Sequence, residues 1–318
     1  MADIALRPMT LGEVLDHTFS LYKRNFWLFA GIVALPYLIV VIFNFFFSNS
    51  FGTAVPAPGA TVSPGDAARL LGALFGAVAV ILLFSLVVFS VAQAATVMAV
   101  SDLYLGHESS VHDSFTRIRS RILAVLFAMA LVYLIAGVAM ILCGSLGGVL
   151  MAVGMILFHP PNNALLGIAM VVLLLPITFV PGIILLCRGA LVVPVATLEP
   201  LGPGRAVARS FRLTKGSGWS VFAVYVLVVF LAYLAIAVFQ GPFLLAEGNP
   251  LKPHALPVYL RVLQGVASWV SGVIVFPIGT IAFSLIYYNQ RVRKEAFDLE
   301  QLVAALGPRE TPPSPSAA

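Results

Sequence analysis

Six long apolar runs constrain this chain more than any other feature of its sequence. Each is at least as long as the ~20 residues that a helix needs to cross a bilayer. Of the 318 residues, 60% are hydrophobic and 10% are charged, whereas soluble domains are about half apolar and a quarter charged. So few charges cannot cover a water-facing surface, so we expect an all-α membrane protein. The expected spans are residues 26–47, 72–100, 122–145, 164–186, 219–240 and 262–288.

A short pattern precedes the first, third and fifth spans at a fixed interval. Phe19, Phe115 and Phe211 lie 96 residues apart, each directly after a Thr or Ser and four residues before a Lys or Arg. A fixed interval of this kind is typical of repeated structural units. We therefore predict three copies of an amphipathic helix followed by a transmembrane hairpin, at about residues 10–100, 106–196 and 202–292.

Two spans in each unit make every copy enter the membrane from the same side. The repeats are then parallel and are related by an axis along the membrane normal. Residues 1–306 form a single six-span membrane domain in this interpretation. The composition of residues 307–318, which end in TPPSPSAA, predicts a disordered tail.

The segment before the first span carries the pattern of a helix start. Thr10 and Glu13 have the spacing of a capping box, in which two side chains satisfy free N–H groups. Apolar residues then recur at helical spacing from Leu11 to Tyr22. Two interpretations stay open, because both produce the same apolar stripe: a helix lying in the membrane surface, or a short cap packed on the spans.

The distribution of Lys and Arg predicts the orientation. All but three of the 18 bases lie on the side that holds both termini, and Arg69, Lys252 and Arg261 lie on the other. Because cytoplasmic loops carry the excess of bases, we expect both termini in the cytoplasm of a bacterial cell, with the chain in the inner membrane. The first span lacks a small-residue cleavage site and is interpreted as retained rather than as a signal peptide.

Basic residues beside the amphipathic segments form the first candidate site. Phosphate head groups attract such clusters at about 1 kcal/mol per base, whereas the net charge of +5 does not indicate nucleic acid, because the bases cluster at the ends of apolar runs. Anchoring of the spans alone explains the same residues and is the more frequent use. The candidate head-group residues are Lys23, Arg24, Arg117, Arg119, Arg121, Arg209, Arg212 and Lys215.

Two amides inside the spans form the second candidate site. Away from their ends the spans contain no Asp, Glu, Lys, Arg or His, which disfavours a proton relay. Asn44 and Gln93 are the amides that remain, and they could line a polar path through the membrane. Hydrogen bonds between helices are the more frequent use of such residues.

The motifs of catalytic and metal sites are missing from the sequence. His107 and His112 flank Glu108 as in a zinc-protease helix, but five residues separate them where one helical face requires four. There is no nucleophile elbow, P-loop or dinucleotide fingerprint. We therefore expect no catalytic, cofactor-binding or metal-binding residue, and no enzymatic activity.

Three stretches together resemble a bacterial membrane-protein family: LRPMTLGEVLDHTFSLYKRNFWLF, ARSFRLTKGSGW and IYYNQRVRKEAFDLEQL. They are similar to the membrane domain that accompanies some glycerophosphoryl diester phosphodiesterases, and to stand-alone relatives of unknown function. That family usually has an acid where Asn289 stands and Gly where Ala296 stands. Hydrolysis in the phosphodiesterases belongs to a separate soluble barrel, so the resemblance implies a membrane module and no active-site residue.

The function that we expect is that of a non-enzymatic scaffold or lipid-associated envelope module. Its partners would be membrane lipids and, as a further option, another envelope membrane protein. The alternative is a carrier or permease for a small solute or lipid, with pseudo-threefold repeats. The lipid specificity, any substrate and the oligomeric state stay open at this level.

Overall fold

The computed structural model describes residues 9–51, 63–158, 164–247 and 257–295, and every regular element in these ranges is a helix. The helices are α1 (Leu11–Arg24), α2 (Phe26–Phe51), α3 (Pro64–Tyr104), α4 (Val111–Ile118), α5 (Ile122–Phe158), α6 (Ala164–Gly189), α7 (Val192–Leu198), α8 (Pro203–Thr214), α9 (Gly218–Glu247) and α10 (Val258–Glu295).

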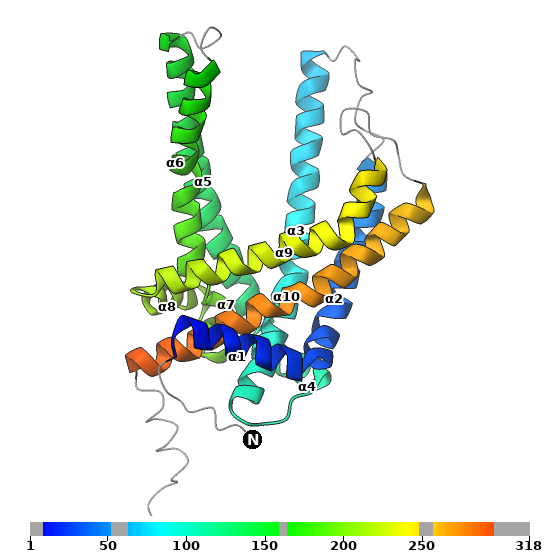
Figure 1. The fold of residues 1–318 in the computed structure, drawn as a ribbon, viewed down its shortest axis with the longest axis vertical. Helices are drawn as coiled ribbons and strands as arrows, with labels where there is room; N and C mark the ends of the chain where they lie inside the picture. Colours follow the sequence, from blue (N-terminus) through cyan, green and yellow to red (C-terminus); the bar gives the residue numbers. More distant parts are fainter. Residues whose placement is uncertain (1–8, 52–62, 159–163, 248–256, 296–318) are drawn as a thin grey trace, which may run out of the picture.

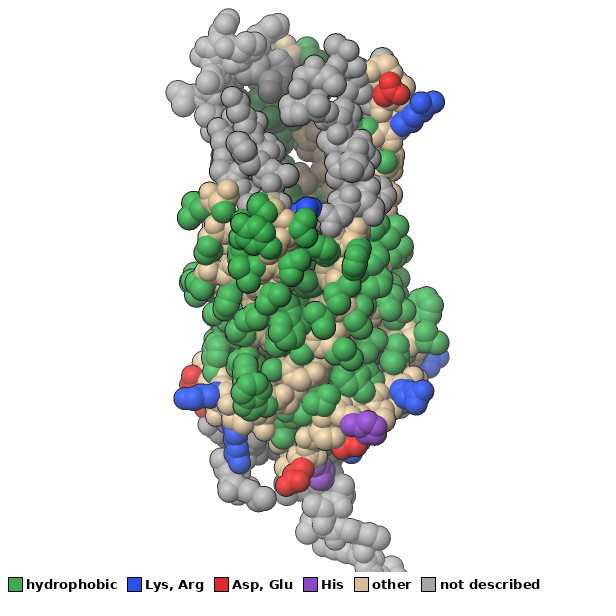
Figure 2. Space-filling model, turned by 90° about the vertical axis from the view of Figure 1, so that its right-hand side faces the viewer, with side chains coloured by type: hydrophobic (Ala, Val, Ile, Leu, Met, Phe, Trp, Pro, Cys, Tyr) green, Lys and Arg blue, Asp and Glu red, His purple; other side chains and the backbone are tan. Residues whose placement is uncertain are grey.

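Six of these helices are long and apolar enough to cross a membrane: α2, α3, α5, α6, α9 and α10. The prediction of six spans is thereby confirmed, and the chain is a multi-pass membrane protein. Figure 2 shows hydrophobic side chains gathered across the middle of the face in view. Most of the charged side chains in that view lie below them.

The long helices pair into hairpins, α2 with α3, α5 with α6, and α9 with α10. The short helices α1, α4, α7 and α8 gather at one end of the molecule, together with the last turns of α10 (Figure 1). We call this end the charged end. The other end of the long helices is called the opposite end. The α5–α6 hairpin stands upright, while α9 and α10 cross the molecule obliquely (Figure 1).

Capping side chains fix where two of the short helices begin. The Thr10 hydroxyl accepts a hydrogen bond from the Glu13 N–H at 3.3 Å, and the Glu13 carboxylate accepts one from the Thr10 N–H at 2.7 Å. The predicted capping box of α1 is confirmed. Ser110 caps α4 in a similar way, because its hydroxyl accepts from the Asp113 N–H at 3.1 Å.

The sequence places the end of the third span near residue 145, followed by an outer segment at 146–163, and this boundary is wrong. α5 continues without a break to Phe158. In lipid, a break in a helix leaves backbone N–H and C=O groups unpaired. The free-energy cost of this is larger than the ~1 kcal/mol by which a glycine destabilises a helix, so the helix continues through its glycines. The glycines also allow close packing on α6, since a Cβ on Gly147 would lie 2.9 Å from the Thr178 hydroxyl oxygen.

The buried core lies toward the charged end. In α3 the side chains of Ala92, Val97 and Val100 are fully buried, whereas Leu74 and Phe75 in its first half are exposed. The same core includes residues of α1, α4, α8 and α10. It also encloses α7, whose residues from Val192 to Thr197 are all buried. No separate helix was predicted at the position of α7, because its apolar residues closely follow the fourth span.

Candidate functional site

The three short helices before α2, α5 and α9 each bury the hydroxyl residue that precedes the repeated phenylalanine. Thr18, Ser114 and Ser210 are fully buried, and they lie 96 residues apart in the sequence. Each donates a hydrogen bond to a backbone carbonyl: Thr18 to Val14 at 2.7 Å, Ser114 to Ser110 at 2.9 Å and Ser210 to Arg188 at 2.8 Å. The residue before each repeated phenylalanine therefore faces the protein, and this position fixes which side of each helix points outward.

Most of the candidate head-group residues lie on the outside of the charged end. The side chains of Lys23, Arg24 and Arg119 are exposed. Arg212 and Lys215 are exposed at the end of α8, while Arg121 is half-buried where α5 begins. Within the described residues, none of these six bases forms an ion pair. Their charges are therefore available to a ligand.

A large apolar side chain follows each group of bases by one helical turn. Trp27, Leu123 and Trp219 are the second residues of α2, α5 and α9, and they are 83%, 66% and 78% exposed. Tryptophan is enriched where hydrocarbon meets head groups, because one edge of its ring is polar and the rest is apolar. This level of the molecule therefore has the chemistry of a membrane interface.

Two of the candidate bases are engaged within the protein. Arg117 forms an ion pair with Asp102 at 2.7 Å. Arg209 lies between two carboxylates, donating to Glu199 at 3.1 Å and to Glu295 at 2.7 Å. Hydrogen bonding to Glu295 raises the pKa of the Arg209 guanidinium against the opposing effect of burial, and Glu199 adds to the rise. Arg209 is thus a structural link between α8 and α10.

Further polar contacts hold Met9 and the end of α8 against the last turns of α10. The Asn289 side chain accepts from the Met9 N–H at 2.9 Å and donates to the Met9 carbonyl at 3.0 Å. Arg293 donates to the same carbonyl at 2.7 Å. Lys294 donates to the Leu213 carbonyl at 2.7 Å, near the end of α8. An amide suits position 289 because it both donates and accepts, which an ionised acid cannot do.

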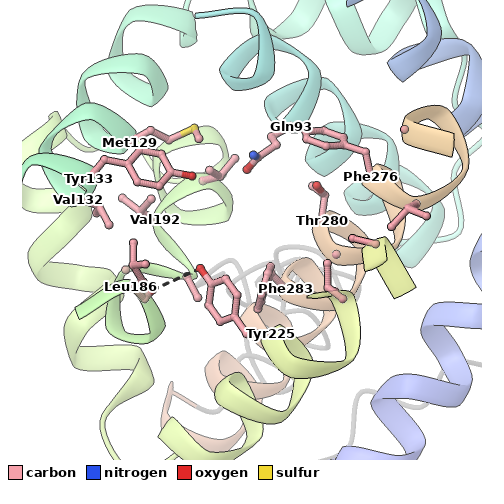
Figure 3. Close-up of a pocket in the computed structure, with 18 of the residues that line it drawn as sticks. Gln93, Met129, Val132, Tyr133, Leu186, Val192, Tyr225, Phe276, Thr280 and Phe283 are labelled. Carbon is pink, nitrogen blue, oxygen red and sulfur yellow. Dashed lines mark hydrogen bonds between the residues drawn. The ribbon is translucent and has the colours of Figure 1, made fainter. Parts of the chain in front are cut away.

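A central cavity of about 320 Å³ lies among the spans. Its volume is at the lower end of the range for small-molecule sites, ~300–1,000 Å³. The lining is mostly apolar and comes from α2, α3, α5, α6, α7, α9 and α10. Figure 3 shows the side chains that face it from opposite sides, Gln93 from α3, Tyr133 from α5 and Thr280 from α10. No acid or base is among the described residues that line the cavity, so these residues can bind a ligand by hydrogen bonds and apolar contact.

The two predicted amides lie in different surroundings. Gln93 lines the cavity, but Asn44 does not, and its side chain donates to the Val40 carbonyl of its own helix at 2.8 Å. Sequence reasoning missed the cavity tyrosines Tyr37 and Tyr133. Their separation of 96 residues matches the interval of the repeated pattern, and this signal could have found them.

Among the described residues, no three His, Cys, Asp or Glu side chains come together in a way that could hold a metal ion. His112 instead lies 3.8 Å from its neighbour Asp113 on the exposed start of α4. The hydrogen bond from Ser110 to the Asp113 carboxylate lowers the pKa of that group, so it stays ionised in the first turn of α4. This segment is a helix start in a polar loop.

Compared with protein-family models, curated proteins and solved structures, the chain matches none of them.

Proposed function

We propose that this chain is a non-enzymatic, lipid-associated envelope module of a bacterial inner membrane. In this proposal the charged end faces the cytoplasm and both termini lie there. The module would contact anionic lipid head groups and serve as a scaffold, with another envelope membrane protein as its second partner. The resemblance of three stretches, near the start, in the middle and near the end of the chain, to the phosphodiesterase membrane domain supports this proposal.

We further propose that the chain consists of three parallel repeats, each an amphipathic helix followed by a hairpin. The helices α2, α5 and α9 begin at residues 26, 122 and 218, which repeats the interval of 96. The buried hydroxyls Thr18, Ser114 and Ser210 recur at the same interval. These two regularities support the repeat.

One observation carries the proposal of lipid contact. Exposed bases, which form no ion pair with any described residue, lie one turn before Trp27, Leu123 and Trp219 at the same end of the molecule. An aromatic or aliphatic side chain at the boundary places the neighbouring ammonium and guanidinium groups at the level of the phosphates. Bases that only anchor a span need no such repeated arrangement.

Replacement of Lys23, Arg119 and Lys215 together by Gln tests this contact. We expect phosphatidylglycerol bound to the purified protein to fall about tenfold or more, because each base contributes about 1 kcal/mol to anionic lipid binding. Native mass spectrometry counts the lipids that stay bound. Arg69→Gln is the matched control, since Arg69 lies at the opposite end and its side chain is 87% exposed. Unchanged lipid in the triple variant would leave the bases with an anchoring role alone.

Reporter fusions test the orientation. Fusions at Pro58, Asn162 and Pro250, which follow the first helix of each hairpin, should report the periplasmic side. Fusions at Gly106 and Gly216, which lie between hairpins, should report the cytoplasm. A cytoplasmic signal at any of the first three positions would contradict the proposed topology.

The central cavity favours a second candidate function, a carrier. Gln93 would then provide hydrogen bonds along the path of a solute. Uptake into proteoliposomes should depend on Gln93 and not on Asn44, which lies outside the cavity. No uptake across a broad panel of solutes would count against a carrier and leave the lipid-associated module.

A further inference from the structure

We propose that the central cavity binds the polar part of an uncharged lipid that carries hydroxyl or carbonyl oxygens. Such a lipid would enter sideways from the bilayer and place its oxygens against Gln93, Tyr133 and Thr280. This site is separate from the bases at the charged end, and the inference does not rest on head-group contact there.

The depth of the cavity indicates what kind of molecule reaches it. Tyr37 and Tyr133 line the cavity eleven residues after the first residues of α2 and α5. At 1.5 Å per residue, this spacing corresponds to about 16 Å along each helix. The hydrocarbon core of a bilayer is about 30 Å thick, so the tyrosines lie near its middle. Lipids with small uncharged polar groups are the amphiphiles that can place oxygen atoms at this depth.

Unpaired hydrogen-bonding groups line this cavity. Within the part of the chain that the structure describes, the side chains of Gln93, Tyr133 and Thr280 form no hydrogen bond. The Tyr225 hydroxyl donates to the Leu186 carbonyl over 3.4 Å, a long bond that leaves its oxygen free to accept (Figure 3). A primary amide can donate twice and accept twice. Because polar groups in apolar surroundings cost free energy when unpaired, a ligand oxygen here gains affinity.

The absence of charge in the lining selects against phospholipid head groups. Among the described residues that line the cavity, none is an Asp, Glu, Lys, Arg or His. A phosphate brought among them would be desolvated without a partner, which costs several kcal/mol even after relaxation. A hydroxyl or carbonyl has no such penalty, so the same cavity accepts a neutral glycerolipid or a quinone.

The exposed members of the lining show where a lipid enters. Tyr133 on α5 and Ile236 on α9 both face the cavity and are still 52% and 44% exposed. Both lie within membrane-spanning segments, so the side of the cavity that they border opens toward acyl chains. The polar part of a lipid can therefore enter the cavity between α5 and α9 while its acyl chains stay in the bilayer.

Binding of dioleoylglycerol to the full-length protein tests the inference, with dioleoylphosphatidate as the charged lipid of identical chains. Native mass spectrometry in detergent gives the affinity of each, and a short-chain ubiquinone distinguishes a glycerolipid from a quinone. We expect dioleoylglycerol or the quinone to bind at least tenfold more tightly than phosphatidate. Equal binding of all three, or no binding of either neutral lipid, would overturn the proposal.

Substitutions connect the binding to the cavity. Gln93→Leu and Tyr133→Phe should each weaken binding of the neutral lipid about fivefold, the loss expected for one hydrogen bond. Matched controls are Asn44→Leu, since Asn44 lies outside the cavity, and Tyr233→Phe, since Tyr233 is exposed and does not line it.

Ala232→Trp is a further variant that fills the cavity without removing a polar group. It should abolish binding, while Arg69→Gln, a change at the opposite end, should leave the affinity for the neutral lipid unchanged. Gel filtration of each variant shows that it is folded. Equal losses in cavity and control variants, or neutral-lipid binding that survives Ala232→Trp, would contradict the assigned site.

Discussion

The two halves of α3 are stabilised in different ways, one by contacts with other helices and the other by contact with lipid. Near the charged end the helix is packed on other helices, and the side chains from Ala94 to Val97 are fully buried. Toward the opposite end, Leu71, Leu82 and Leu83 are exposed. The charged end is therefore held by protein contacts, whereas the opposite half relies on acyl chains to cover its surface.

The charged end also has polar contacts that join segments far apart along the chain. Arg209 links Glu199 to Glu295, Arg117 pairs with Asp102, and Asn289 holds Met9. Each of these contacts joins segments that are separate along the chain. The contrast can be tested by making the same substitution in each half.

The largest difference should come from two phenylalanines. Phe29 is fully buried in the core, whereas Phe75 is 74% exposed on α3. Phe29→Ala should lower the free energy of unfolding by about 3–5 kcal/mol, the usual cost of such a cavity. Phe75→Ala should cost less than about 1 kcal/mol, because lipid fills the space. Unfolding by sodium dodecyl sulfate in mixed micelles measures both, and equal losses would contradict the comparison.

Two arginines should give the next largest difference. Arg209→Gln leaves the carboxylates of Glu199 and Glu295 without their shared partner in a partly buried site, so we expect a loss of about 2–3 kcal/mol. Arg69 pairs with Asp66 at the opposite end, but both side chains are largely exposed. Arg69→Gln should change stability by less than about 0.5 kcal/mol. The same unfolding titration compares them, and an equally small effect of Arg209→Gln would show that the link is dispensable.

Among the three destabilising substitutions, the glycine change should give the smallest loss of stability. A Cβ on Gly272 would lie 2.1 Å from the Tyr37 ring, so Gly272→Ala must displace that ring and should cost about 1–3 kcal/mol. No atom lies within 4 Å of a Cβ at Gly76, where alanine should be neutral or stabilising by up to about 1 kcal/mol. Thermal unfolding distinguishes the pair. A stable Gly272→Ala protein with an unchanged cavity would show that Tyr37 is not held against α10.

The sequence was sufficient to predict the spans, because a helix in hydrocarbon must be long and apolar and have all its backbone groups paired. For the same reason α5 stays helical at its glycines, where the expected boundary was wrong. Local spacing also predicted the cap of α1, since Thr10 and Glu13 are three residues apart. The short helix α7 was missed because burial on all sides leaves no periodic pattern to detect.

Contacts between distant segments could not be predicted in this way. Arg209 has the same local pattern as the exposed bases, yet its partner Glu295 lies 86 residues away on α10. Likewise, Asn44 and Gln93 are alike in sequence, and only the packing of the helices places Gln93 in the cavity. The interval between Tyr37 and Tyr133 was present in the sequence, but their shared surroundings depend on how the spans assemble.

Depth-dependent fluorescence quenching tests the central claim, that the charged end lies at the head groups and the middle of the molecule in hydrocarbon. The chain has three tryptophans, so single-Trp variants with Phe at the other two positions report separately. Trp27 and Trp219 lie at the charged end. The Trp269 side chain donates a hydrogen bond to the Ala34 carbonyl at 2.8 Å, and Ala34 lies eight residues after the first residue of α2, so Trp269 is deeper in the membrane. We expect lipids brominated near the head group to quench Trp27 and Trp219 most, and lipids brominated deep in the chains to quench Trp269 most. Deep quenching of Trp27, or no lipid quenching of Trp269, would contradict the account.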